Sequence, residues 1–174
     1  MTADLDSLAD PFKAKAYRLQ EIIDRDGLPM RLMEARRKFT TQRDYFMKGR
    51  GDSHGITVVV DKSKVITQAR PGQSPHNWGL AVDYVIDTDH AHPYWAEEAL
   101  PTGAWDTGYD GKTLARPNVK LVWERYGRAV KEADLEWGGH WKFVDMPHAQ
   151  LFGWDRYRPA NWQEIVIREL SNGN

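Results

Sequence analysis

One segment, GQSPHNWGLAVDYVI at 72–86, limits the possible folds more than any other part of the chain. Its first half contains proline and glycine, which favour a loop of defined shape. Its second half is a short apolar run, which predicts a buried strand over roughly 79–86. The fold must therefore place an irregular loop directly before a core strand. His76 lies in the loop, and Asp83 lies seven residues later in the strand.

The segments before this one alternate between helical and extended patterns. Apolar residues recur at helical spacing after Asp10, which we expect to cap a helix over about 11–25. We expect a short strand at roughly 30–36. A second helix is expected from about 40, with Thr40 or Thr41 as its cap.

The later segments continue the mixed order. GITVVVDKSKVIT is rich in β-branched residues, which favour strands. The polar, Gly- and Pro-rich segment 87–116 is expected to be a surface insertion. A helix is expected from about 117, HWKFVD is expected to form a strand, and the chain closes with a helix that has Pro159 near its start. Helices and strands that follow no regular β–α–β order predict an α+β fold, with one domain over 1–174.

Length and composition exclude several classes of protein. A chain of 174 residues can bury the core of one domain. It has no cysteine, so any metal site must use His, Asp or Glu. The formal net charge of −1 gives no overall signal for nucleic-acid binding. The longest apolar run, ITVVV, is too short to cross a bilayer, and the start MTADLDSLADPF lacks the basic and apolar regions of a signal peptide.

Two of the six histidines lie near an aspartate in a restrained part of the chain. His76 precedes Asp83, and His148 follows Asp145 by three residues in DMPHAQ. Two histidines and one carboxylate suit a zinc site with a fourth position open to water, where zinc acidifies the water and polarises a carbonyl. A further carboxylate such as Asp145 then accepts the proton. From spacing alone, the alternatives stay open: a loop histidine bonded to backbone, a surface-paired aspartate and a half-buried histidine.

Two motifs in this region resemble those of the M15 metallopeptidases. SPHNWGLAVD at 74–83 resembles the family signature SxHxxGxAxD, and WGGHWKFVDMPHAQ at 137–150 is similar to its second motif. EARRKFTTQRDYFMKGR at 34–50 resembles the family's arginine-containing segment. The resemblance extends over about 30–152. Within the family it points to the L-alanyl-D-glutamate peptidases, found as phage endolysins and as bacterial cell-wall hydrolases.

The resemblance implies a small antiparallel sheet flanked by helices with a zinc site at the sheet, as in Hedgehog and D,D-peptidase folds. It implies one Zn²⁺ ion held by His76, Asp83 and His148, and it makes Asp145 the catalytic carboxylate. The family's arginine, which steadies the substrate or the oxyanion, falls on Arg37. The neighbouring Arg36 is an alternative, because a shift of one residue along a strand turns a side chain to the other face.

The resemblance also implies a substrate and a setting. The expected activity is cleavage of the peptidoglycan stem peptide between L-Ala and D-Glu, by a monomer that neither binds nucleic acid nor inserts into a membrane. Without a signal peptide or an added wall-binding domain, it would be made in the host cytoplasm and reach the wall through a holin, as an endolysin.

Two rival functions remain. One is a D,D-carboxypeptidase or D-Ala-D-Ala dipeptidase, although the dipeptidases favour Glu at Asp145. The other is a non-catalytic wall-binding module of the same fold.

One position departs from the family pattern. His140 stands in the tryptophan–glycine–glycine turn, where related sequences often carry an aspartate. It could contact the substrate, compete as a metal ligand or be a surface substitution. His54, His90 and His92 have no motif context and are expected to lie in solvated loops.

Overall fold

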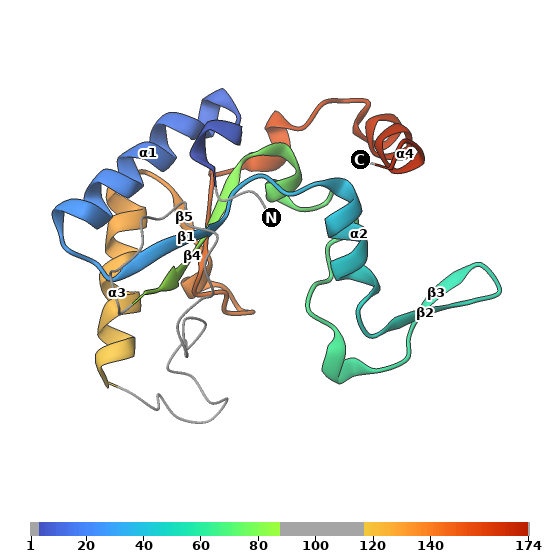
Figure 1. Cartoon of the computed structure of the whole chain (residues 1–174), viewed down its shortest axis with the longest axis horizontal. Helices are drawn as coiled ribbons and strands as arrows, with labels where there is room; N and C mark the ends of the chain where they lie inside the picture. The colour runs from blue at the N-terminus through green and yellow to red at the C-terminus, as the bar shows by residue number, and fades with distance from the viewer. Residues whose placement is uncertain (1–3, 88–116, 174) are drawn as a thin grey trace.

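A computed structural model describes residues 4–87 and 117–173 of the chain. Apart from Asp87, the expected insertion at 87–116 lies outside the described residues, and so do His90 and His92. The described residues form a single α+β domain, as predicted (Figure 1).

A four-stranded antiparallel sheet forms the centre of the fold, with the strand order β1–β4–β6–β5. Its strands are β1 (Met30–Glu34), β4 (Ala81–Ile86), β5 (Glu136–Trp137) and β6 (His148–Gln150). Two strands far apart in sequence, β1 and β6, therefore flank β4, the strand predicted from the apolar run. Side chains of these three strands that point the same way meet on one face of the sheet.

Strand β4 shows which face carries the core. Its alternate residues belong to the hydrophobic core: Val82, Tyr84 and Ile86. Because successive side chains of a strand point to opposite faces, Asp83 points away from this core. In β6 the same alternation puts Ala149 in the core and His148 on the face of Asp83.

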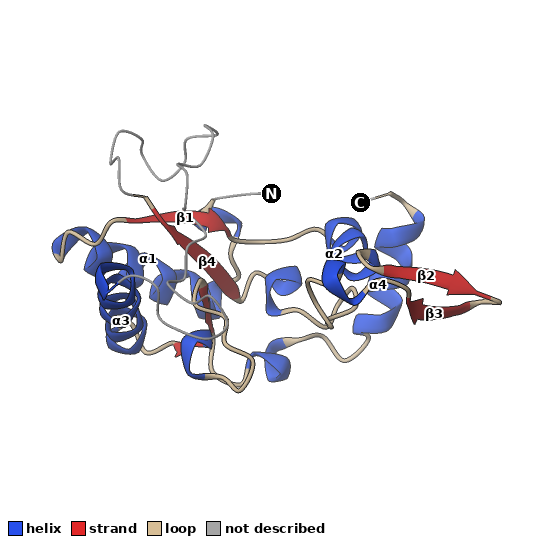
Figure 2. Cartoon of the chain, turned by 90° about the horizontal axis from the view of Figure 1, so that it is seen from below, coloured by secondary structure: helices blue, strands red, loops and turns tan. Residues whose placement is uncertain are grey.

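Two long helices cover the core face of the sheet. Helix α1 (Asp10–Arg25) and helix α3 (Pro117–Glu132) lie side by side against it (Figures 1 and 2). Both are amphipathic, and their buried faces supply much of the core: Phe12, Ala16, Leu19, Ile22, Ile23, Trp123, Tyr126, Ala129 and Val130. The opposite face of the sheet stays free for polar side chains.

The second part of the molecule lies on the side of the sheet opposite α1 and α3 (Figure 1). It contains helix α2 (Phe39–Met47), helix α4 (Trp162–Ser171) and a hairpin of β2 (Arg50–Ser53) and β3 (Ile56–Val59). Figure 2 shows the hairpin projecting at the far end of the molecule. Five short 3₁₀ helices complete the described elements: Leu5–Ser7, Lys62–Lys64, Pro75–Trp78, Gly138–His140 and Trp154–Tyr157. No helix in the described ranges combines the length and apolar character needed to span a bilayer.

Two predicted helix caps were wrong. Asp10 is the first residue of α1, and the residue before it, Ala9, makes no side-chain cap. The following proline is tolerated because the first N–H groups of a helix have no partner within it. Helix α2 begins at Phe39, so Thr40 and Thr41 lie inside its first turn.

The strand predicted at HWKFVD was also wrong. A 3₁₀ turn ends at His140, and the residues after it form a loop. Phe143 is 85% exposed, although its aromatic ring favours a strand in isolation. The loop is closed by the Asp145 N–H, which donates to the Gly138 carbonyl at 3.0 Å. The local preference fails because no neighbouring strand pairs with this segment in the sheet.

Candidate metal centre

The loop before β4 holds His76 in one orientation. His76 lies in the 3₁₀ helix Pro75–Trp78 and is 2% exposed. Its Nδ1 lies 2.8 Å from the Ala35 carbonyl oxygen, so Nδ1 carries the hydrogen and Nε2 offers its lone pair to the cleft. Gly79 then turns the chain into β4 with φ +68, and a Cβ there would lie 2.9 Å from the Ala9 nitrogen. The proline and glycine of this segment therefore present the imidazole from a closely packed turn.

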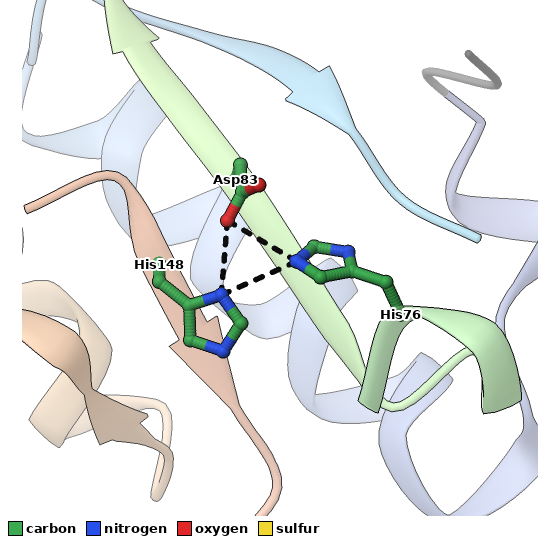
Figure 3. Close-up of side chains that lie close together, drawn as sticks. All are labelled: His76, Asp83 and His148. Atoms are coloured by element: carbon green, nitrogen blue, oxygen red, sulfur yellow. Dashed lines mark hydrogen bonds and ion pairs between the residues drawn. The ribbon is translucent and has the colours of Figure 1, made fainter. Parts of the chain in front are cut away.

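The sheet places the other two residues opposite each other. Asp83 on β4 and His148 on β6 are register partners, so both side chains project from the same face of the sheet. Figure 3 shows His76, Asp83 and His148 pointing toward one another from a 3₁₀ helix and two strands. His148 Nδ1 lies 3.0 Å from Asp83 Oδ1, and His76 Nε2 lies 3.3 Å from the same oxygen. The two histidine nitrogens are 3.2 Å apart.

These separations fit a zinc ion. Tetrahedral zinc with ligands at about 2.0–2.1 Å keeps neighbouring ligand atoms roughly 3.3 Å apart. The three atoms of this cluster already stand close to that spacing, and two imidazoles with one carboxylate are ligands that zinc accepts. No other group of three metal-ligating side chains converges in this way within residues 4–87 and 117–173.

The electrostatics of the cluster also favour a cation. Burial opposes the charge of Asp83, but His76 and His148 outweigh it and hold the pKa of that carboxyl well below its ordinary value. Burial likewise opposes a charged His148, yet the hydrogen bond to Asp83 raises the pKa of the imidazole. Asp83 is therefore a carboxylate at neutral pH, and it attracts positive charge to the position between the two rings.

A chain of hydrogen bonds supports His148 from behind. Its Nε2 lies 3.0 Å from Gln150 Oε1, which leaves Nδ1 to face Asp83. Gln150 Nε2 donates to Glu136 Oε2 at 2.8 Å, and Trp141 Nε1 donates to Glu136 Oε1 at 2.9 Å. The indole of Trp141 also packs against the His148 ring, with centroids 5.1 Å apart. Glu136 thus anchors both neighbours of this imidazole.

Strand β1 adds an acid and an arginine to the same face. An irregularity after Leu32 brings Glu34 opposite Asp83. Arg37 binds this carboxylate through Nε at 2.8 Å and through Nη2, and its Nη1 donates to Gln42 Oε1 at 2.7 Å. Nη2 also lies 3.7 Å from Asp83 Oδ2. Arg37 is therefore held beside the cluster by two flanking side chains.

The two candidate arginines lie in different places. Arg37 lines the cleft that contains the cluster, whereas Arg36 is exposed and lines a different hollow beside Ser7 and Glu169. The arginine chosen from the sequence is the one that lies beside Asp83.

Asp145 lies on the same cleft, close to the cluster but outside it. Partial loss of water around its side chain raises the pKa of Asp145, and the charge of Asp83 adds to this effect. Gly138 makes the position possible, because a Cβ on this glycine would lie 2.5 Å from the Asp145 carbonyl oxygen. The carboxylate is thus accessible from the cleft and harder to ionise than a free aspartate.

The other described histidines stay outside the cluster. His140 is exposed, and its ring meets Trp137 with centroids 4.9 Å apart. It lines a hollow on the far side of Trp141, so it does not compete for the position between His76 and His148. His54 lies at the hairpin tip, as expected of a loop residue.

Comparison with known proteins gives two findings. Residues 67–151 match the sequence model of a peptidase M15 family described as D-alanyl-D-alanine carboxypeptidase. The chain is also 29% identical over 140 residues to the peptidoglycan L-alanyl-D-glutamate endopeptidase CwlK of Bacillus subtilis (strain 168). That similarity covers 80% of this chain and 70% of the relative. Both findings confirm the resemblance drawn from the two motifs.

Proposed function

From this relationship to the M15 peptidases, we propose that the protein is a zinc-dependent hydrolase that cuts the stem peptide of bacterial peptidoglycan between L-Ala and D-Glu. The observation that carries the proposal is the convergence of His76 Nε2, Asp83 Oδ1 and His148 Nδ1 at one cleft. The activity named for the Bacillus subtilis relative supports the choice of substrate and bond.

His76, Asp83 and His148 would hold one zinc ion. When bound, zinc supplies Lewis-acid polarisation of the scissile carbonyl and makes a water molecule more acidic. The residues behind the ligands keep them in place: the Ala35 carbonyl orients His76, and Gln150 orients His148.

Asp145 would move the proton in this reaction. Its carboxylate oxygen accepts a proton from the attacking water and then passes it to the nitrogen of the leaving amine. A pKa raised by desolvation suits both steps, because the group is a better base than a free aspartate and gives the proton up again. Its place on the cleft wall, beside the ligands, supports this role.

Arg37 would stabilise the negative charge that develops on the carbonyl oxygen. A guanidinium has five N–H donors, and within the described residues three of its nitrogens each donate to Glu34 or Gln42. The remaining hydrogens of Nη1 and Nη2 are available to a substrate oxygen. The contacts to Glu34 and Gln42 hold the group in place before the substrate arrives.

A D,D-carboxypeptidase is the second candidate, because the family that matches residues 67–151 carries that description. Mass spectrometry of purified peptidoglycan after digestion separates the two. Peptides with a new N-terminal D-Glu, absent from a chelator-treated sample, support the proposed endopeptidase. Release of free D-Ala supports the carboxypeptidase. No cleavage by protein with bound zinc would leave the non-catalytic wall-binding module as the better account.

We also propose that the protein acts as a phage endolysin, a monomer that reaches the wall after holin release. The resemblance of its motifs to those of endolysins supports this setting. Expression in a Gram-negative host tests it, since lysis should require co-expression of a holin. Lysis without a holin, or survival with one, would contradict this role.

A further inference from the structure

Among the described residues around the cleft, one cation has no acidic partner. Its described lining contains three carboxylates, on Glu34, Asp83 and Asp145, and two permanent cations, on Arg37 and Lys48. Arg37 is 10% exposed in its side chain and is paired with Glu34, and the proposed function assigns its remaining N–H groups to the carbonyl oxygen of the scissile bond. Among the described residues, Lys48 has no ion pair.

The fold holds Lys48 at the rim of the cleft. It is the C-terminal capping residue that follows helix α2, and its N–H donates to the Tyr45 carbonyl at 3.3 Å. Its Nζ lies 5.3 Å from the centre of the Tyr45 ring, and the Arg37 guanidinium carbon lies 4.9 Å from the same centre. Gly49 follows with φ +72, and a Cβ there would collide with the Asp61 carbonyl oxygen. The turn after α2 therefore fixes where the lysine stem begins.

From this geometry we propose that Lys48 is a specificity residue that binds the free carboxylate of the D-Glu residue in the substrate. The inference rests on the proposed function. Glutamate has two carboxyl groups, and only one is used in the bond to the next residue of the peptide, so one negative charge remains next to the scissile bond. Within the part of the chain that the structure describes, Lys48 is the cleft-lining cation without an ion pair; it lies on the α2 side and is exposed to an incoming peptide.

The charge of Lys48 is available to the substrate at little cost. An ammonium at an exposed rim keeps part of its hydration when a carboxylate binds to it, and among the described residues Lys48 has no ion pair that has to break. A partly exposed contact between an ammonium and a carboxylate changes affinity by roughly three- to tenfold. The contact is screened by salt, so the preference should shrink as ionic strength rises.

Two synthetic stem peptides test the proposal. They differ only at D-Glu, where one has the free carboxylate and the other has a carboxamide. The kcat/KM of the zinc-loaded protein is measured for both. We expect the wild type to prefer the carboxylate peptide by roughly three- to tenfold. Lys48→Met should lose this preference, because its kcat/KM for the carboxylate peptide falls toward its value for the carboxamide peptide. Binding of one equivalent of zinc shows that the variant is folded.

Two further variants serve as controls. Lys48→Arg should keep the preference, and so should Lys62→Met, which removes an exposed lysine from outside the cleft lining. A wild type that cuts both peptides equally, or a Lys48→Met variant that keeps the preference, overturns the role of Lys48 and leaves the peptidase intact. If the wild type cuts neither peptide, the proposed function falls, and this inference falls with it.

Discussion

At the scale of single residues, the polar neighbours of a ligand should matter as much as its own position. Gln150 fixes which nitrogen of His148 faces Asp83. Replacing it by leucine removes the acceptor, frees the imidazole to rotate and leaves the N–H of a buried ring unpaired. We expect Gln150→Leu to lower zinc affinity by about 10- to 100-fold, measured by competition with a coloured chelator. Gln68→Leu, at an exposed glutamine outside the cleft, should leave the affinity unchanged.

Asp145 should behave differently from the ligands, because it lies outside the cluster. Asp145→Asn keeps the shape of the side chain and removes its ability to accept a proton. We expect kcat to fall by about 10²- to 10⁴-fold, while one equivalent of zinc still binds. Metal content measured on the same sample separates the two effects. Loss of zinc together with activity would show that Asp145 supports the metal site instead of moving a proton.

The residues that converge at the cleft were largely predictable from the sequence. His76, Asp83 and His148 stand in motifs whose types and spacing suit zinc, and the family resemblance assigned them. Gln150 was missed, although a strand that presents His148 to the cleft must present the residue two positions later on the same face. Glu34 could not be placed, because the irregularity in β1 shifts the alternation and changes which side chain lies opposite Asp83.

At the scale of elements, the close approach at Gly138 joins the two halves of the second motif. A Cβ there would lie 2.5 Å from the Asp145 carbonyl oxygen and 3.2 Å from the His148 Cβ. Neither the backbone at Asp145 nor strand β6 at His148 can easily move away from an added methyl group. We expect Gly138→Ala to destabilise the protein by about 1–3 kcal/mol and to reduce zinc affinity, as read from urea unfolding and metal competition.

A second glycine variant provides the matched control. Gly51 lies in strand β2 of the hairpin, and its nearest neighbour would be a Val60 methyl at 3.4 Å. Gly51→Ala should leave zinc affinity unchanged. If Gly138→Ala binds zinc as tightly as this control, the close approach does not define the site.

The elements differ in how well their sequences predicted them. Strand β4 and helices α1 and α3 were expected because a long or strongly patterned apolar face fixes both their type and their packing partner. The predicted strand at HWKFVD failed because strand formation requires a partner, and local preference carries no information about one. The strand that does pair, His148–Gln150, has three residues, too few for a periodic pattern.

At the scale of the whole molecule, the core and the metal cluster lie on opposite faces of one sheet. Leu19 on α1 is fully buried in that core, and Leu19→Ala should lower the free energy of unfolding by about 2–5 kcal/mol. Because the ligand side chains project from the sheet face opposite the core, the zinc affinity of the folded variant should match that of the wild type. Urea unfolding and metal competition measure the two quantities. A large loss of affinity would show that core packing, and not the strand register, sets the ligand spacing.

The central claim is that a single zinc ion at His76, Asp83 and His148 makes this fold a peptidase. The most direct test adds zinc stepwise to chelator-stripped protein and follows cleavage of the carboxylate stem peptide. Activity should rise in proportion to added zinc and level off at one equivalent, and Asp83→Ala should stay inactive throughout the same range. Full cleavage by the stripped protein, or recovery of activity in Asp83→Ala, would contradict the account.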